Sequence, residues 1–210
     1  IIFGHKRILF QTKKIPFKYK DKKIGIVGIA RDITGLYEIQ EKLKKQAYYD
    51  ELTKIFNRKA YNERIQEKFD LFDRYDTNFT IAMYDIDDFK KINDTYGHDI
   101  GDKVLVEITN EVKSIIRKTD FFFRIGGEEF VIIFAKTSLD EAYDIAEKIR
   151  INISKMQIIE NEKITISMGI TQAIANDNPQ SIYERVDKLM YQSKRNNKNQ
   201  TTKGWFLQHN

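Results

Sequence analysis

Cysteine is absent from this chain of 210 residues. Without a thiol, disulfide bonds, thiolate nucleophiles and cysteine-ligated zinc sites are excluded. The three histidines, His5, His98 and His209, lie too far apart in the sequence to suggest a metal-binding motif. The sequence also lacks an apolar run near the roughly 20 residues that a membrane-spanning helix needs, and it does not open with a signal-peptide pattern. We therefore expect a cytoplasmic segment without membrane contact.

Charge and hydrophobicity leave several classes of partner open. Hydrophobic residues make up 41% of the chain and aromatic residues 12%, which argues against disorder. The length suits one domain of about 150 residues with an appendage. The formal net charge of +5 fits nucleic acid, an anionic membrane surface or small anionic ligands. Because the lysines are scattered rather than gathered into a stripe, we expect no nucleic-acid binding.

A glycine pair followed by two acids lies between two apolar runs that favour β-strands. Residues 124–130 read Arg-Ile-Gly-Gly-Glu-Glu-Phe, which predicts a hairpin whose tip can approach a ligand closely. Glu128 and Glu129 would lie at that exposed turn. A second apolar strand, beginning at Phe79, ends in Asp85-Ile-Asp-Asp. Folding can bring these two acidic strand ends together.

The second strand end suits a metal ion. Period-two alternation places Asp85 and Asp87 on one face and leaves Ile86 to present its carbonyl oppositely. Magnesium prefers hard oxygen ligands in octahedral geometry, so two acidic tips and a backbone carbonyl could hold it beside substrate phosphates. The alternative, a polar hairpin tip and a strand end with solvated acids, stays open on these residues alone.

Helical and strand patterns alternate through most of the chain. Besides the hairpin, we predict helices over residues 52–72, 99–118, 139–156 and 180–195, and strands over residues 79–85 and 164–171. Strands interleaved with helices of this length predict an α/β or α+β sandwich, with helices over a central sheet.

The first 30 residues alternate short β-rich runs with turn residues. We predict strands over residues 7–12, 15–19 and 23–30, which are too few for an independent core. The run from Gly25 to Thr34 resembles the last strand and exit motif of a PAS sensor domain. This resemblance implies that residues 1–33 are the C-terminal fragment of such a domain, within a longer protein.

A connecting helix is predicted over residues 34–49. Its apolar residues recur at spacings of three and four and form one stripe: Leu36, Ile39, Leu43 and Ala47. A parallel coiled coil with a second copy and packing onto the chain's own domain are both open alternatives.

Five ordered blocks resemble the GGDEF domain, the family of diguanylate cyclases, which join two GTP molecules into cyclic di-GMP. The blocks are Asp50-Glu-Leu-Thr-Lys-Ile-Phe-Asn-Arg58, the segment from Asp85 through Gly97-His98 to Gly101-Asp102, the turn Gly126-Gly-Glu-Glu-Phe130, residues 164–170 and residues 187–194. The resemblance implies an α+β domain over residues 50–200, with a mostly antiparallel central sheet flanked by helices as in nucleotidyl cyclases and polymerase palms. Residues 201–210 form a tail.

The resemblance implies a set of metal ligands. Asp85, the Ile86 carbonyl and Glu128 would bind Mg²⁺, with Mn²⁺ as the alternative, and Glu129 would support or share that role. Asp85, Glu128 and Glu129 are thus the candidate catalytic residues. Glu128 is also the suggested base for the ribose 3′-hydroxyl. A metal-bound carboxylate is a poor base, so orientation and a metal-lowered hydroxyl pKa are the competing explanation.

The same resemblance implies substrate contacts. The amide of Phe89, together with Lys90, Lys194 and Lys198, would contact the triphosphate, where lysine acts as a point charge. Without the motif, Lys194 would be interpreted as a solvated lysine on a C-terminal helix.

Two further pairs concern guanine and product. Asn93 and Asp102 match guanine-reading positions, and an aspartate accepts from guanine N1 and N2 hydrogens that adenine lacks, which favours GTP over ATP. Arg117 and Asp120 resemble the R-x-x-D site at which cyclic di-GMP inhibits the family.

The sequence departs from the family's pattern at two places. Lys54 replaces a glycine usual in the first block, and Lys198 replaces a usual arginine. We predict a homodimeric diguanylate cyclase that its product inhibits. The alternative is a module that binds GTP or cyclic di-GMP without catalysis, and the retained acids Asp85, Glu128 and Glu129 favour the enzyme.

Overall fold

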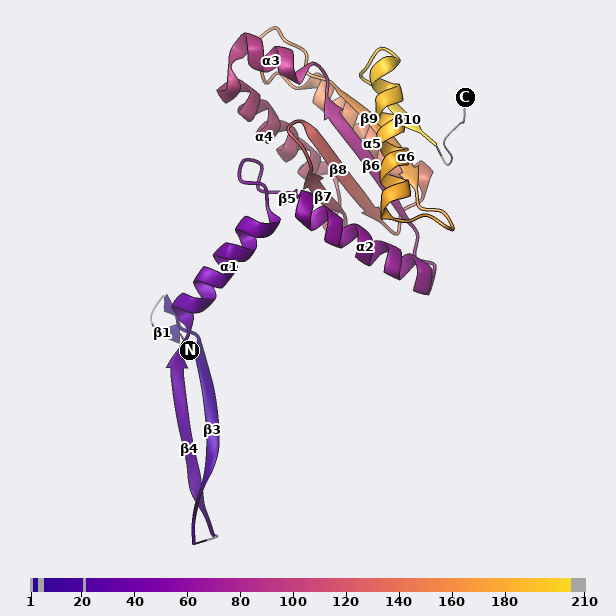
Figure 1. Ribbon diagram of the computed structural model, residues 1–210. Helices are drawn as coiled ribbons and strands as arrows, with labels where there is room; N and C mark the ends of the chain where they lie inside the picture. The colour runs from indigo at the N-terminus through magenta and orange to yellow at the C-terminus, as the bar shows by residue number, and fades with distance from the viewer. Residues whose placement is uncertain (1, 4–5, 21, 205–210) are drawn as a thin grey trace. The chain divides into compact units, whose positions relative to one another are not determined.

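The protein is described by a computed structural model that covers residues 2–3, 6–20 and 22–204 (Figure 1). The chain divides into two compact units, Ile1–Ala47 and Tyr48–Asn210. His5, His209 and the predicted tail beyond residue 204 lie outside the described residues. None of the helices in the described ranges combines the length and the apolar character that crossing a membrane requires.

The first unit consists of two antiparallel strand pairs followed by a helix. The pairs are β1 (Ile2–Phe3) with β2 (Lys6–Arg7) and β3 (Phe10–Tyr19) with β4 (Lys22–Asp32), and the helix is α1 (Thr34–Tyr48). The predicted break between residues 12 and 15 is wrong, because β3 runs on through Pro16, which lies opposite Ile26. A two-stranded sheet leaves one edge of each strand unpaired, so a proline without an N–H group is tolerated. The PAS assignment of this unit stays a prediction.

Helix α1 begins at Thr34, as predicted for the connecting helix. The Asp32 carboxylate accepts hydrogen bonds from the Thr34 amide at 2.9 Å and the Thr34 hydroxyl at 2.6 Å. None of the residues in α1 is buried. The residues of the predicted apolar stripe all lie on this helix. Their side chains are exposed: Leu36 is 67%, Ile39 60% and Leu43 60% exposed.

A six-stranded sheet forms the centre of the second unit. Its strand order is β10-β9-β6-β8-β7-β5. The strands are β5 (Phe56–Asn57), β6 (Phe79–Ile86), β7 (Phe121–Arg124), β8 (Glu129–Ala135), β9 (Ile166–Gln172) and β10 (Thr201–Lys203). Only the outer pairs β9–β10 and β5–β7 are parallel within this sheet. The prediction of a mostly antiparallel central sheet is confirmed, and β10 gives structure to the start of the predicted tail.

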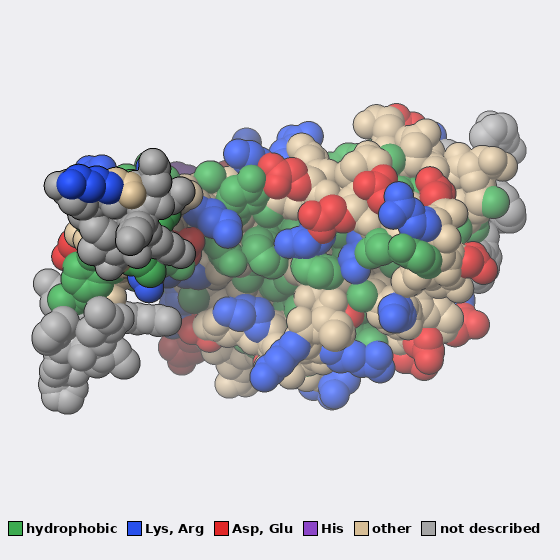
Figure 2. All heavy atoms as spheres, turned by 90° about the horizontal axis from the view of Figure 1, so that it is seen from below, with side chains coloured by type: hydrophobic (Ala, Val, Ile, Leu, Met, Phe, Trp, Pro, Cys, Tyr) green, Lys and Arg blue, Asp and Glu red, His purple; other side chains and the backbone are tan. Residues whose placement is uncertain are grey.

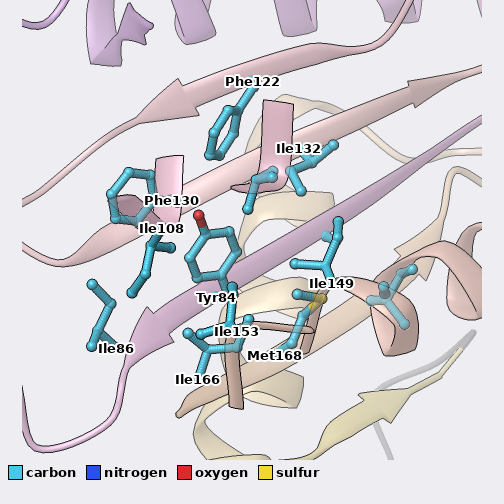
Figure 3. Packing of buried hydrophobic residues seen from close by; sticks show 14 of the residues in the cluster. Tyr84, Ile86, Ile108, Phe122, Phe130, Ile132, Ile149, Ile153, Ile166 and Met168 are labelled. Carbon is cyan, nitrogen blue, oxygen red and sulfur yellow. The ribbon is translucent and has the colours of Figure 1, made fainter. Parts of the chain in front are cut away.

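Helices cover both faces of this sheet (Figure 1). One face packs against α2 (Arg58–Tyr75) and α6 (Pro179–Arg195), and the other against α3 (Phe89–Tyr96), α4 (His98–Ile115) and α5 (Leu139–Lys155). Alternation along β6 divides the core: Met83 faces α2 and α6, whereas Tyr84 faces α4 and α5. The Tyr84 ring stacks on Phe130 with centroids 5.0 Å apart, among the isoleucines visible in Figure 3.

One helix prediction needs correction, and one helix was missed. The helix predicted from residue 52 begins only at Arg58, after a turn and the short strand β5. Lys54 adopts a left-handed conformation with φ of 59°, which a right-handed helix cannot contain. Asn57 then caps α2, accepting from the Ala60 amide at 3.1 Å. Helix α3 was not predicted, since its eight residues are too few for a clear periodic pattern.

Basic side chains do not segregate from the rest on the visible surface. On the face that Figure 2 shows, lysine and arginine side chains are interspersed with hydrophobic and acidic ones. This distribution agrees with the scattered lysines of the sequence.

Candidate active site

The two acidic strand ends lie side by side at one end of the central sheet. In the β6–β8 ladder, Asp85 pairs directly with Glu129. The Ile86 amide donates to the Glu128 carbonyl at 3.4 Å, just beyond this pair. Antiparallel pairing of β6 with β8 therefore brings Asp85, Ile86, Glu128 and Glu129 together, although Asp85 and Glu128 are 43 positions apart in the sequence.

Asp85 is a buried carboxylate with a lysine partner. It is 5% exposed, and its Oδ2 lies 2.7 Å from the ammonium of Lys194. Burial raises the pKa of Asp85, Lys194 lowers it, and the neighbouring charges of Glu128 and Glu129 raise it again, so that the pKa is about 6. Burial is the largest of these effects, and the Lys194 ammonium shows that this carboxylate already holds a cationic partner.

The donor set suits a hard metal ion. Asp85, Glu128 and Glu129 supply carboxylate oxygens and Ile86 supplies a carbonyl, which are the ligand types that magnesium and manganese accept. In the described ranges, no three His, Asp or Glu side chains converge closely enough to hold a metal. The Lys194 ammonium instead neutralises Asp85. The residues fit a divalent cation by their chemistry and by the positive charge already drawn to Asp85.

Glycine at position 126 allows Glu129 to fold back over the turn. A Cβ atom at Gly126 would lie 2.6 Å from Glu129 Oε2. The Glu129 carbonyl accepts from the amides of Ile125 at 2.9 Å and Gly126 at 3.4 Å, which closes the hairpin. A side chain at position 126 would therefore displace the Glu129 carboxylate from its position over the turn.

Close packing of α6 on β9 positions Lys194. A Cβ atom at Gly169 would lie 2.3 Å from the Met190 nitrogen and 2.4 Å from the Val186 carbonyl oxygen. The helix backbone therefore rests directly on this strand. Ser193 holds the next turn by donating to the Met168 carbonyl at 2.7 Å.

Asp87 is a residue that sequence reasoning left without a role. Its carboxylate accepts from Thr165 Oγ1 and Ser167 Oγ, both at 2.6 Å, and from the Asn199 amide at 3.1 Å. Asp87 therefore anchors the C-terminal segment to the strand end. The small hydroxyl residues of the neighbouring strand were the signal that could have identified it, once the pairing of β6 with β9 was known.

The anchored segment brings Lys198 to the start of α3. The Lys198 ammonium lies 2.7 Å from Asp88 Oδ1, and Asp88 is the N-cap position of α3. Phe89 and Lys90 are the first two residues of that helix; Phe89 is buried and Lys90 is exposed. Of the four predicted triphosphate contacts, Lys194 lies beside Asp85. Lys198 lies beside the N-cap of α3, the helix that begins with Phe89 and Lys90.

Of the predicted guanine-reading residues, Asn93 lies against the residue that precedes Asp102. A Cβ atom at Gly101 would lie 1.9 Å from Asn93 Oδ1, so Asn93 of α3 rests against the first turn of α4. Asp102 follows Gly101 directly and is exposed. The turn at Gly97, where φ is 85°, folds α3 back onto α4 and makes this approach feasible.

Arg117 and Asp120 lie away from these residues, in the turn between α4 and β7. The Asp120 carboxylate accepts from the Arg117 amide at 2.9 Å and the Ala135 amide at 3.3 Å. An adjoining open groove of about 570 Å³ is lined by Lys68, Leu71, Thr77, Asn78, Phe79, Arg117, Thr119, Phe121, Ala135 and Lys136. Three of these side chains are cationic, so the groove suits an anion.

Comparison with protein families gives one assignment for this unit. A family model described as "Diguanylate cyclase, GGDEF domain" matches residues 47–200. The diguanylate cyclase DgcM of Escherichia coli K12 is 33% identical over 189 residues, which are 90% of this chain and 46% of DgcM. A diguanylate cyclase of Vibrio cholerae strain O395 is 35% identical over 195 residues, 91% of this chain and 61% of the relative. The chain spans less than two thirds of the length of these relatives.

Solved structures agree with the fold. The coiled coil and GGDEF domain of DgcB from Caulobacter crescentus, in complex with c-di-GMP, has a TM-score of 0.79 at 29% identity. The match covers 82% of this chain and 93% of that solved chain. The active GGEEF domain of a Vibrio cholerae diguanylate cyclase has a TM-score of 0.68 at 34% identity, and covers 70% and 96% of the two chains.

Proposed function

We propose, from the premise that this chain belongs to the GGDEF family of diguanylate cyclase domains, that it condenses two GTP molecules into cyclic di-GMP and two pyrophosphates. One observation carries the proposal: Asp85 and Glu129 pair across two strands, with the Lys194 ammonium 2.7 Å from Asp85. This arrangement puts acids for a cation and a lysine for phosphate at one strand end. A binding module without catalysis has no need for the full set of acids.

The family generally uses a divalent metal ion. We propose Mg²⁺, with Mn²⁺ as the alternative, held by Asp85, the Ile86 carbonyl, Glu128 and Glu129. When bound, the ion supplies positive charge to the substrate phosphates and lowers the pKa of the attacking hydroxyl. Lys194 would then exchange its carboxylate partner for a phosphate oxygen.

Each bond-forming step is a phosphoryl transfer. The ribose 3′-oxygen of one GTP bonds to the α-phosphorus of the other, the hydroxyl proton leaves, and the bond to pyrophosphate breaks. Two such steps close the ring. Because one domain presents one GTP, we propose a homodimer in which two domains meet face to face, so that proximity contributes several kcal/mol, on the order of 7 at best.

Substrate selection follows from residues around α3. We propose that Asn93 and Asp102 read guanine, which is supported by the close approach of Asn93 to Gly101, the residue before Asp102. The Phe89 amide, Lys90 and Lys198 would hold the triphosphate, with Lys198 close to the start of α3 through Asp88. An aspartate accepts from two guanine hydrogens that adenine lacks, so ATP would bind poorly.

Product inhibition is proposed at Arg117 and Asp120. The cationic groove beside them supports an anionic ligand there, and a solved relative, DgcB, is in complex with c-di-GMP. Asp120 is held in place by two backbone amides, which leaves the Arg117 side chain to engage guanine or phosphate.

We propose that the N-terminal residues regulate the catalytic domain and that the protein acts in the cytoplasm. Residues 1–33 would be the end of a PAS sensor domain, and residues 34–49 would transmit its state to the catalytic domain. The exposed apolar stripe of α1 supports an oligomeric connector.

The test is product formation from GTP and magnesium, resolved chromatographically beside an ATP reaction. Glu128→Gln and Asp85→Asn should each lower turnover at least about 100-fold, because each removes a charge placed on the reacting phosphates. Asp144→Asn, an exposed change on α5 across the sheet, is the matched control and should retain activity. No cyclic di-GMP from a folded, dimeric wild type, or retained activity in both variants, would refute the proposal in favour of a ligand-binding module.

A further inference from the structure

Arg124 holds the turn that carries the two acids. Its Nε and Nη2 atoms both donate to the Gly127 carbonyl, at 3.1 and 2.8 Å. Its Nη1 donates to Asp50 Oδ1 at 3.0 Å. The Arg124 side chain is only 14% exposed. Three of its five N–H groups are thus committed, two of them to a single carbonyl of the glycine pair.

Asp50 is itself held firmly. Its Oδ1 accepts from the Thr53 amide at 2.7 Å and from the Thr53 hydroxyl at 2.6 Å. Its amide donates to the Ile55 carbonyl at 2.8 Å, and its own carbonyl accepts from Lys54 at 3.0 Å. Asp50 is therefore a fixed acceptor, and the Arg124 guanidinium is clamped between it and the turn.

The clamp acts next to Glu128. The Gly127 carbonyl, on one side of Glu128, is bound by Arg124, and the Glu128 carbonyl, on the other side, is bound by the Ile86 amide at 3.4 Å. Two adjacent glycines would otherwise leave this backbone free to adopt many conformations. Both peptide groups that flank Glu128 are held, so the direction in which its Cα–Cβ bond leaves the backbone is set.

We propose that Arg124, fixed by Asp50 and Thr53, is a positioning residue that aims the Glu128 carboxylate at the reacting groups. The inference rests on the proposed diguanylate cyclase activity. Arg124 acts through the backbone of Gly127 and touches no substrate atom. Functional side chains need support that holds them within about 0.5 Å of the productive geometry, and a glycine turn cannot supply it alone. Asp50 lies two residues after the last residue of α1, so the clamp begins where the connecting helix ends.

The decisive variant is Arg124→Lys. Lysine keeps the positive charge beside Asp50, but it cannot donate two hydrogen bonds to one carbonyl from a planar fork. Asp50→Asn and Thr53→Val weaken the clamp from its other end. We expect Arg124→Lys to lower kcat at least tenfold while KM for GTP changes less than threefold, with Asp50→Asn in the same direction. Arg64→Lys, which alters an exposed arginine of α2 paired with Glu67, is the matched control and should match wild type.

A second readout does not depend on turnover. Amide hydrogen exchange at Ile86 and Gly126, whose N–H groups close the turn, should quicken at least tenfold in Arg124→Lys while the melting temperature stays close to wild type. The double variant Asp50→Asn/Arg124→Lys should lose no more activity than Arg124→Lys alone, because both changes disable one clamp.

The outcomes separate this inference from the proposed function. Wild-type protein that makes no cyclic di-GMP refutes the function, and the exchange rates then decide whether Arg124 orders the turn. With an active wild type, faster exchange together with the loss in kcat supports the positioning role. An unchanged kcat in Arg124→Lys overturns the positioning role. A lower kcat with unchanged amide exchange also overturns it, as does a rise in KM as large as the fall in kcat.

Discussion

Lys54 illustrates how a single residue can be held in a conformation that its side chain disfavours. Its φ of 59° lies in the left-handed region, and its amide donates to the Asp50 carbonyl at 3.0 Å. The family's usual residue at this position is glycine, which adopts such angles without a Cβ clash. The strain is therefore accepted here to keep the turn that presents Asp50.

We expect Lys54→Gly to stabilise the protein. Relief of the left-handed strain, about 1 kcal/mol, should exceed the extra conformational entropy of glycine in the unfolded chain, for a net gain of about 0.5 kcal/mol. Urea unfolding measures the change. Lys54→Ala keeps the Cβ atom and serves as the control without gain. Equal stability of the glycine and alanine variants would contradict the argument.

Asp85 and Asp87 mark how far residue-level prediction reaches. Alternation along a strand predicted both on one face, but β6 ends at Ile86 and Asp87 lies in the turn that follows, where the alternation no longer applies. Their different environments depend on distant residues: Lys194 of α6 beside Asp85, and Thr165, Ser167 and Asn199 around Asp87. Such partners are set by packing. The sequence therefore predicted that acids gather at this strand end, but not which of them is engaged in holding the fold.

At the scale of elements, the contact between α6 and β9 controls the site. Gly169 leaves no space for a side chain beneath the helix backbone. Lys194 lies one turn beyond Met190, so any lift of α6 moves its ammonium relative to Asp85. Stability and activity should therefore change together at this contact.

Gly169→Ala tests this coupling. The added methyl group forces α6 away from the sheet, and we expect a loss of about 3 kcal/mol of unfolding free energy together with a marked fall in turnover. Gly28→Ala, a β4 glycine with no atom within 4 Å of the added Cβ, is the control. Thermal melts and GTP turnover give both values, and a stable variant with full activity would disprove the coupling.

The start of α6 depends on a buried ion pair. Asp177 accepts from Arg185 at 2.7 and 2.6 Å, and the two side chains are 5% and 6% exposed. Burial acts to raise the pKa of Asp177, but the hydrogen bonds from Arg185, the Ile174 amide and Ser181 outweigh it, so the pKa lies below its usual value of 3.8.

The pair predicts a pH profile. A depressed folded pKa means that the stabilisation is complete above about pH 4 and is lost as the pH falls through the folded pKa. At pH 7, Asp177→Asn should cost about 3 kcal/mol, since it leaves Arg185 buried without a charged partner. Urea unfolding from pH 7 to pH 2 should show the difference from wild type shrinking in acid. Asp140→Asn, whose carboxylate is 83% exposed, should show no such trend.

Helices were predicted well where an apolar pattern repeats over many residues. They were predicted poorly where a turn in the backbone interrupts the helix. Helices α4, α5 and α6 end within a few residues of their predicted limits, because each buries one apolar stripe. Helix α2 starts later than predicted, since the turn around Lys54 stops it. The β7–β8 hairpin followed from the local glycine pattern, whereas the mostly antiparallel character of the whole sheet followed from the resemblance.

At the scale of the whole molecule, α1 carries a surface that needs a partner. Its apolar stripe is exposed within its own unit, with Ile39 and Leu43 both 60% exposed. A second copy of the chain would cover the stripe by pairing a and d positions in a parallel coiled coil. Such a connector would also bring two catalytic domains into reach of each other.

We therefore expect Ile39→Glu and Leu43→Glu to raise the dimer dissociation constant at least tenfold and to lower turnover at low protein concentration. Two like charges facing each other in an apolar seam are strongly unfavourable. Lys44→Glu adds the same charge off the stripe and should leave the dimer intact. Sedimentation velocity across a concentration series measures the effect. An unaltered dimer in both stripe variants would place the interface elsewhere.

The pairing of Asp85 with Lys194 constrains how this protein can change over generations. Loss of Lys194 alone leaves a buried carboxylate without its counter-charge, and loss of Asp85 alone leaves the ammonium at a site without its acceptor. Each single step costs stability as well as activity. A relative that has lost catalysis should therefore have lost Asp85 and Lys194 together. We expect this joint loss, rather than substitutions in the glycine turn, to mark such relatives.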